Sequence, residues 1–313
     1  MIKIFSWVTK DTNFDFMKSK NITYAVSSIL VVLSIISIAV KGFNFGIDFS
    51  GGILMEIKSP EIINVENLRK ELSSLNIDDL NLQAIGEKGD EIVIRAQAKE
   101  LDEKAQMNII NSIKEKLGQK YEYRRIDLVG PQVGDELKRD GLIASILAVL
   151  AISLYVWFRF EWQFALGTII GLTHDVIVTC GLLSFFGLDF SLTTVAAILT
   201  LAGYSVNDTV VTYDRIRENL SKFKKMNQTD LLNKSLNDIL SRTFLTGLTT
   251  MFAALALLIW GGETLRSFAF TIFWGVIVGT YSSIYVSTVF LLPFDLRATQ
   301  EAQNNVNPFG NVQ

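Results

Sequence analysis

Six apolar runs most constrain what this chain can fold into. As an α-helix, a run of about 20 residues spans the hydrocarbon core of a bilayer and satisfies its own backbone hydrogen bonds. In chain order the runs cover residues 22–40, 141–158, 164–186, 192–213, 242–260 and 268–292. The chain is 49% hydrophobic, and these residues are clustered rather than scattered. The sequence therefore predicts an α-helical polytopic membrane protein with six transmembrane helices, the last five within residues 139–294.

We interpret the first run as a retained anchor, a transmembrane helix over residues 21–40. Residues 1–20 mix lysines with aromatic and aliphatic side chains, which predicts an amphipathic cytoplasmic segment at the membrane surface. A flexible arm is the alternative for that segment. A cleavable signal sequence is an alternative for the run, because Ser37-Ile-Ala39 resembles a cleavage site. The length of the apolar run and of the segment before it favours the anchor.

Residues 41–138 have the patterning of a soluble domain. The stretches GGILMEIKS, NLQAIGE, DEIVIRAQ and YEYRRIDLVG are predicted strands, with Lys88-Gly89 as the turn between the second and the third. NVENLRKELSSL is a predicted helix with Asn64 as its N-cap, and LDEKAQMNIINSIKEKLG is a second helix ended by Gly118. The order β-α-β-β-α-β is that of a ferredoxin-like unit, so one α+β extracytoplasmic domain is expected.

Lysine and arginine residues in the short loops predict the orientation. The segment 214–241, expected to be a cytoplasmic loop, carries several of them, whereas the loop 187–191 carries none. Residues 1–20 add four lysines. We therefore expect both termini in the cytoplasm, including a disordered polar tail over 295–313. The domain 41–138 is then expected on the outer face of the membrane, which in a bacterium is the periplasmic side.

The composition argues against several classes of protein. A formal net charge of −3 indicates no nucleic-acid partner. One cysteine allows neither a disulfide framework nor a cysteine-based metal site. The chain has no phosphate-binding G-x-x-x-x-G-K-[ST], no H-E-x-x-H and no C-x-x-C motif. We therefore expect no cofactor, no metal and no energy source in ATP bound by this chain.

Asp208 is an acid inside the fourth run. It lies about 17 residues beyond Ser191, or roughly 25 Å along a helix, which puts it in the cytoplasmic third of the span. An ionised side chain at the bilayer centre costs about 2.5–3.5 kcal/mol, and a low dielectric favours the neutral carboxyl. We predict a proton-carrying carboxylate, with an interfacial acid that reaches water as the alternative. The polar residues expected to support it are Tyr204, Ser205, Asn207 and Thr209.

Two further charged positions lie in the predicted spans. Asp175 is mid-way along the third run, beside His174, the only histidine. We expect a structural role for His174, whereas Asp175 is expected to bond to the fourth helix or to line the same wet path. Arg242 opens the fifth run, which is antiparallel to the fourth, so it is expected to come level with Asp208, pair with it and be released when Asp208 is protonated. The alternative is an anchor at the membrane edge.

Four stretches together resemble the SecD/SecF family of bacterial protein-export proteins. They are FNFGIDFSGG (43–52), VGPQVGDELKRDG (129–141), THDVIVTCG (173–181) and GYSVNDTVVTYDRIREN (203–219). The first is shared by both branches of the family. The chain length and the S-x-N-D-T form favour the SecF branch over SecD. The resemblance covers nearly the whole chain.

The resemblance implies a partner, a driving force and a site. A SecF subunit pairs with SecD in a twelve-span assembly similar to resistance-nodulation-division transporters. That assembly associates with the SecYEG channel, with YajC and YidC as further candidate partners, and uses protons to pull or release the translocating preprotein at a late stage. The membrane acid and arginine of the family match Asp208 and Arg242. Two alternatives stay open: a small-molecule or lipid exporter of the same superfamily, and a passive scaffold of the export channel.

Overall fold

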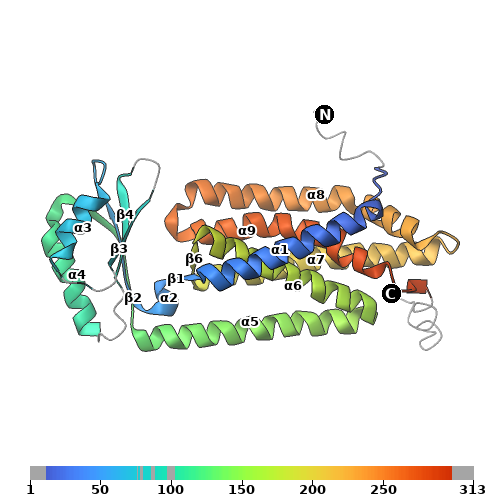
Figure 1. Ribbon diagram of the computed structural model, residues 1–313, viewed down its shortest axis with the longest axis horizontal. Coiled ribbons are helices and arrows are strands. Elements are labelled where there is room, and N and C mark those ends of the chain that lie inside the picture. Colours follow the sequence, from blue (N-terminus) through green and yellow to red (C-terminus); the bar gives the residue numbers. More distant parts are fainter. Residues whose placement is uncertain (1–11, 76, 78–79, 86–88, 97–102, 298–313) are drawn as a thin grey trace.

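The computed structural model describes residues 12–75, 77, 80–85, 89–96 and 103–297. A small α/β domain stands at one end of a bundle of long helices (Figure 1). In this described part, six helices are long and apolar enough to cross a membrane. The predicted amphipathic segment 1–20 and the predicted tail 295–313 lie largely outside the described residues.

The long helices occupy the predicted runs. They are α1 (Lys20–Lys41), α5 (Pro131–Arg159), α6 (Trp162–Phe186), α7 (Leu192–Lys222), α8 (Gln228–Trp260) and α9 (Gly262–Ser282). Within their apolar stretches, 50% of α6, 44% of α7 and 44% of the α9 region is buried, against 6% of α5 and 11% of α1. Because α6, α7 and α9 form the centre of the bundle, polar side chains on their inner faces must find partners inside the protein.

The structure differs from the prediction over residues 214–241. This segment is not an open loop, because α7 continues to Lys222 and α8 already begins at Gln228. The two extensions form a helical hairpin in which the Asn219 side chain donates to the Ser235 hydroxyl at 2.9 Å. Its apolar side is buried through Leu220, Leu231, Leu232 and Leu236. Most charged residues of this segment lie on the two helices, and Lys224 and Lys225 lie in the short turn between them.

The small domain has the element order that the sequence predicts. Its elements are β2 (Gly52–Lys58), α3 (Val65–Ser73), β3 (Leu80–Ile85), β4 (Glu91–Ala96), α4 (Glu103–Leu117) and β5 (Glu122–Val129). The sheet order is β3-β4-β2-β5, and each neighbouring pair is antiparallel. Asn64 caps α3 as predicted, because its side chain accepts from the N–H groups of Glu66 and Asn67.

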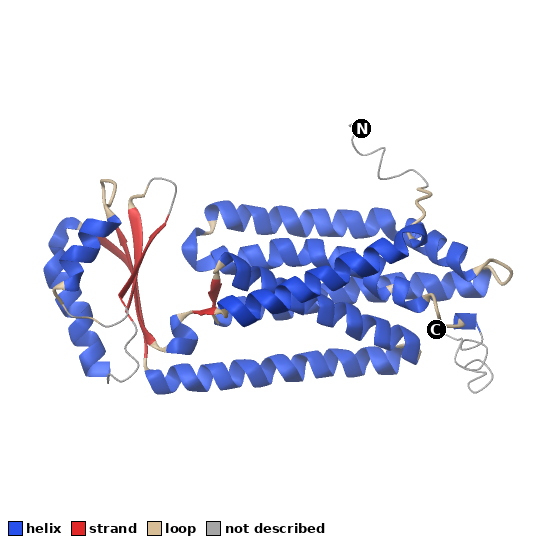
Figure 2. Cartoon of the chain, viewed as in Figure 1, coloured by secondary structure: helices blue, strands red, loops and turns tan. Residues whose placement is uncertain are grey.

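Each face of this sheet has a different environment. The helices α3 and α4 cover one face (Figure 2) and bury an apolar core that includes Ile53, Met55, Ile57, Leu68, Leu72 and Ile113. The opposite face is turned toward the bundle (Figure 1). Between them, β1 (Asn44–Phe45) pairs in parallel with β6 (Asp189–Phe190), and α2 (Ile47–Ser50) follows β1. These three short elements, which join distant parts of the chain, do not stand out in the sequence.

Candidate functional site

Two acids are buried in the centre of the bundle, one on α6 and one on α7. The side chain of Asp175 is 0% exposed and Asp208 is 7% exposed. Both were predicted from the sequence as charged residues inside membrane spans. Their surroundings differ in the number of partners that each carboxyl group has.

Asp175 joins three of the inner segments. Its Oδ2 accepts hydrogen bonds from the hydroxyls of Ser205 on α7, at 2.5 Å, and Ser282 on α9, at 2.7 Å. Its Oδ1 lies 3.0 Å from Nδ1 of His174. Ser205, which was expected to support Asp208, therefore belongs to Asp175 instead. With both oxygens partnered, Asp175 connects α6, α7 and α9.

Asp208 is only half satisfied. Its Oδ1 accepts a hydrogen bond from the Thr243 hydroxyl on α8 at 2.8 Å. Its Oδ2 is buried and has no hydrogen-bond partner among the described residues. A buried polar atom without a partner costs free energy, whereas a protonated oxygen becomes a donor that can bond elsewhere. A proton bound at this oxygen would therefore turn an unpartnered acceptor into a hydrogen-bond donor.

Arg242 does not pair with Asp208 in this conformation. Its side chain is exposed, and no ion pair between the two is found in the part of the chain that the structure describes. Neighbouring residues on a helix point about 100° apart, so α8 can direct only one of Arg242 and Thr243 at Asp208. Here that residue is Thr243. The predicted ion pair is therefore absent from this conformation.

The other predicted polar residues are divided between the inside and the outside of the bundle. Thr209 is buried, and its hydroxyl lies 2.9 Å from the hydroxyl of Ser283. Tyr204 is half-buried, and Asn207 is exposed. Asn207 thus does not support Asp208 within this chain, and it lies on a part of α7 that faces outward.

Sequence reasoning missed a cluster of hydroxyl groups at the end of α9. The stretch after α9 is a π-helix, η4 (Ser283–Ser287). The Thr288 hydroxyl donates to the carbonyl of Ser283 at 2.9 Å, and the Tyr213 hydroxyl donates to the carbonyl of Ser287 at 3.0 Å. Short π segments occur often at functional sites. The signal in the sequence was SSIYVST (282–288), in which three serines and one threonine lie inside an apolar run, and all four are buried.

Three of these hydroxyl groups, those of Ser282, Ser283 and Thr209, belong to residues that bond to one acid or follow the other, and we refer to the three as the hydroxyl file. Ser282 bonds to Asp175, and the next residue, Ser283, bonds to Thr209. Thr209 in turn follows Asp208 in α7. Since a hydroxyl both donates and accepts, a change of protonation at either acid can reorder the bonds that hold α7 to α9. No cluster of metal-ligating side chains is present in the residues that could be searched.

Comparison with known proteins decides the family. The family model for the C-terminal region of the protein export membrane proteins SecD and SecF matches residues 109–297, and the model for the SecD/SecF GG motif matches residues 36–59. The chain belongs to the SecD/SecF family.

Individual relatives agree with the SecF branch. The protein translocase subunit SecF of Rickettsia felis is 46% identical over 283 residues, which cover 90% of this chain and 92% of the relative. The corresponding subunit of Rickettsia prowazekii is 44% identical over 289 residues, 92% of this chain and 93% of the relative. The predicted resemblance is confirmed, and this SecD/SecF-family chain is a protein-transport subunit.

A solved structure confirms the fold class. The crystal structure of SecDF from Thermus thermophilus, a translocon-associated membrane protein, is 35% identical to this chain with a TM-score of 0.81. The match covers 90% of this chain and 39% of the SecDF chain, so this chain spans less than half of that protein. This family member is therefore a helical membrane protein, and six helices in its described part are long and apolar enough to cross the membrane.

One outer face of the bundle is unusually polar for a surface in lipid. On α7 the exposed residues that follow a helical repeat are Ala196, Thr200, Gly203 and Asn207. On the neighbouring α8, Arg242, Thr246 and Thr249 are exposed. Small and polar residues in membrane spans are typical of helix–helix contacts, and an exposed arginine is costly in lipid. We refer to these seven residues as the α7/α8 face.

Proposed function

We propose that this SecD/SecF-family protein is a proton-driven accessory subunit of the Sec translocase that, with SecD, promotes a late stage of protein export across the bacterial inner membrane. The observation that carries the proposal is the carboxyl group of Asp208. It is buried, bonded to α8 through one oxygen and without a partner at the other among the described residues. When such a carboxyl group gains or loses a proton, its hydrogen bonds to the neighbouring helices must change.

In the proposed cycle the proton acts on the contact between α7 and α8. When ionised, Asp208 accepts from Thr243 or, after α8 turns, pairs with the adjacent Arg242. When protonated, it no longer holds the arginine, and α8 returns to the arrangement seen here. One charge that crosses 100 mV supplies about 2.3 kcal/mol, which biases a two-state equilibrium about 50-fold. Asp175 and the hydroxyl file are proposed to transmit this change to α6 and α9.

The orientation and the partners are part of the same proposal. Both termini are placed in the cytoplasm, and the small domain is placed outside, where it meets the translocating preprotein. SecD is proposed to cover the α7/α8 face, since Asn207 and Arg242 would otherwise lie against lipid. SecYEG is the proposed channel, with YajC and YidC as further partners.

The proton-driven function is tested in inverted membrane vesicles that export a preprotein. Vesicles with this chain and vesicles depleted of it are compared with and without an ionophore that collapses the proton gradient. We expect the gradient to accelerate the late stage of export only in vesicles that contain the chain. Equal acceleration in depleted vesicles would exclude the proton-driven role and leave the passive scaffold and the small-molecule or lipid exporter.

The proposed SecD contact is tested by substituting leucine for Gly203. A Cβ at Gly203 meets nothing within 4 Å in this chain, so the leucine should leave the chain itself folded while obstructing a partner helix. We expect recovery of a SecD-like partner from native membranes to fall several-fold. Ala144→Leu, on the exposed side of α5, makes a small-to-large change elsewhere on the surface and serves as the matched control. Undiminished recovery with Gly203→Leu would place the partner on another face.

A further inference from the structure

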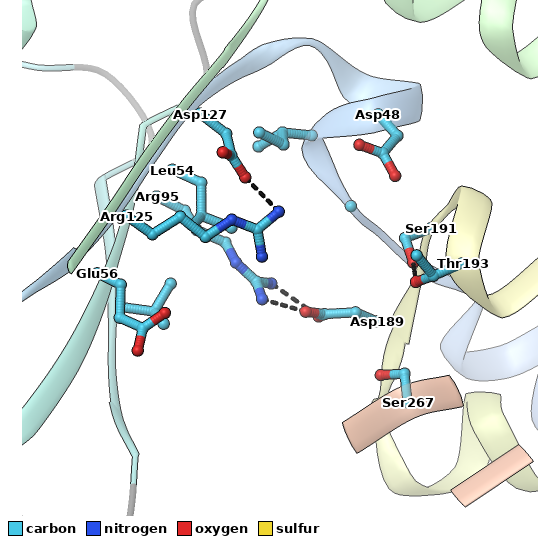
Figure 3. Close-up of a pocket in the computed structure, with 13 residues that line it drawn as sticks. Asp48, Leu54, Glu56, Arg95, Arg125, Asp127, Asp189, Ser191, Thr193 and Ser267 are labelled. Atoms are coloured by element: carbon cyan, nitrogen blue, oxygen red, sulfur yellow. Dashed lines mark hydrogen bonds and ion pairs between the residues drawn. The ribbon is translucent and has the colours of Figure 1, made fainter. Parts of the chain in front are cut away.

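An ion pair connects the small domain to the helix bundle. Arg95 on β4 extends from the sheet face that is turned toward the bundle and reaches Asp189 on β6 (Figure 3). The Nη1 atom of Arg95 donates to Oδ1 of Asp189 at 2.8 Å, and Nη2 pairs with Oδ2. Such a bidentate contact fixes the orientation of the two side chains as well as their distance. The side-chain amide of Asn44 also donates to Oδ1 of Asp189 at 2.8 Å.

Asp189 is in turn tied to the start of α7. The Thr194 hydroxyl, in the first turn of α7, donates to the carbonyl oxygen of Asp189 at 2.7 Å. Oδ2 of Asp48 accepts from the backbone N–H of Leu192 at 3.0 Å, so residues near the domain help to cap this helix. Because α7 is one continuous helix that carries Asp208, the contact to Asp189 links the position of the domain to the helix that bears the proposed proton site.

The two covalent connections between domain and bundle approach each other where glycines leave their backbones uncovered. Gly51, with φ +68°, precedes β2, and a Cβ built on it would lie 3.1 Å from Cα of Pro131 at the start of α5. A Cβ on Gly134 would lie 3.0 Å from the backbone nitrogen of Gly51. An aromatic cluster of Phe43, Phe45, Phe49 and Phe190 packs beside this crossing. The backbones approach closely here, which suits a pivot.

The space between the sheet face and the bundle is hollow and contains several charged side chains, unlike the packed pivot. A cavity of about 80 Å³ is lined by charged side chains, including Arg95, Arg125, Asp127 and Asp189 (Figure 3). That volume has room for several waters, since one water needs about 10–15 Å³ measured in the same way. Arg95 and Asp189 are also partly exposed, at 14% and 26%. Separating them exposes charges that water can solvate, so the contact is weak enough to open and close.

We propose that Arg95 and Asp189 are positioning residues that latch the small domain to the start of α7, and that the latch opens as the domain rocks about the Gly51–Gly134 crossing. The ion pair sets the position of the domain, and the glycine crossing stays intact in both positions. The proposal rests on the proposed function in one respect: the rocking of the domain is driven by the proton that binds at Asp208. The ion pair between Arg95 and Asp189 forms whether or not a proton gradient is present.

The test measures the distance between domain and bundle by pulsed electron spin resonance on the full chain in nanodiscs. Spin labels are attached through Ile62→Cys in the domain and Trp260→Cys at the end of α8, both strongly exposed, after Cys180→Ser removes the native thiol. Loss of a partly exposed ion pair is expected to raise the population at altered distances roughly fivefold in Arg95→Ala. The combined exchange Arg95→Asp with Asp189→Arg should restore the wild-type distribution.

Arg124→Ala is the matched control, because Arg124 pairs with Glu91 at 2.7 Å inside the domain and does not reach the bundle. It should leave the distances unchanged. An unchanged distribution in Arg95→Ala, or a charge exchange that fails to restore it, would overturn the latch. If Arg95→Ala fails to fold, the charge exchange and Arg95→Lys decide, since a latch requires the first to restore the distance and the second to restore it in part. These distances are read without a gradient, so failure of proton-driven export would leave this test intact.

Discussion

Asp208→Asn is expected to remove the gradient-dependent part of protein export while the chain still folds and inserts. The amide has nearly the same volume as the carboxyl group, and its oxygen can still accept from Thr243, which lies 2.8 Å from Oδ1. It cannot take up a proton. The bias of about 50-fold that one charge gains from 100 mV should therefore disappear. The vesicle assay measures this as a rate of late export that no longer responds to the ionophore.

Asp175→Asn is the matched comparison for this experiment, because it makes the same substitution at the other buried acid. Oδ2 of Asp175 accepts from both Ser205 and Ser282, so an amide group there loses either an acceptor or the contact to His174. We expect a lower thermal stability than for Asp208→Asn. A chain with Asp208→Asn that still exports in response to the gradient would exclude Asp208 as the proton carrier.

Gly181→Ala is expected to detach α1 from the bundle, although it adds a single methyl group. A Cβ at Gly181 on α6 would lie 2.2 Å from Cβ of Ser34 and 2.6 Å from its Cα. Because the second contact is with backbone, no side-chain rotation relieves it, and the two helices must separate. Overpacking of this kind costs about 1–3 kcal/mol, and we expect the upper end. The midpoint of thermal unfolding in detergent, with cross-linking between α1 and α6, measures the effect.

Gly203→Ala provides the control for this substitution. It places the same methyl group on the neighbouring helix α7, where nothing lies within 4 Å in this chain. Alanine is also the better helix former, so this variant should be as stable as the wild type or slightly more stable. Equal stability of the two variants would show that α1 is held by contacts other than the Ser34–Gly181 crossing.

The attachment of α1 shows how a membrane helix is held with little buried surface. Its buried residues are Thr23, Ser27 and Ser34, a polar side rather than an apolar one. The Ser27 hydroxyl lies 2.9 Å from the hydroxyl of Tyr281 on α9. Lipid is as apolar as leucine, so close approach and interhelical hydrogen bonds hold such a helix in place. The apolar side chains of α1 remain on the outside.

Local patterns predicted most elements of the fold and misjudged one. The strands and helices of the small domain follow from their periodicity, and Asn64 caps α3 as its position before an amphipathic run predicts. The start of α8 at Gln228 was missed, since polar and charged residues there ended the apolar run. Hydropathy marks where a helix enters lipid, and it does not mark where the helix begins when the first turns lie outside.

The sequence predicted the two acids of the candidate site but not the side chains that bond to them. Asp208 and Asp175 stand out because a carboxyl group inside an apolar run is costly wherever it points. The partner of Asp208 depends on the rotation of α8, and a difference of one residue exchanges Arg242 for Thr243. The serines of the π-helix η4 were passed over because hydroxyl groups in a membrane helix can bond to their own backbone and so carry little signal alone.

By itself, the sequence determined the six spans, the order of elements in the small domain, the SecD/SecF family and the two buried acids, because each is written in residues that are close together in the chain. Only the tertiary structure decided which hydroxyls meet those acids, that Asn44 lies beside Asp189 across 145 residues, and that Arg95 reaches the start of α7. These contacts depend on how helices are rotated and how strands are aligned. Neither quantity changes the pattern of hydrophobic and polar residues from which a single sequence is read.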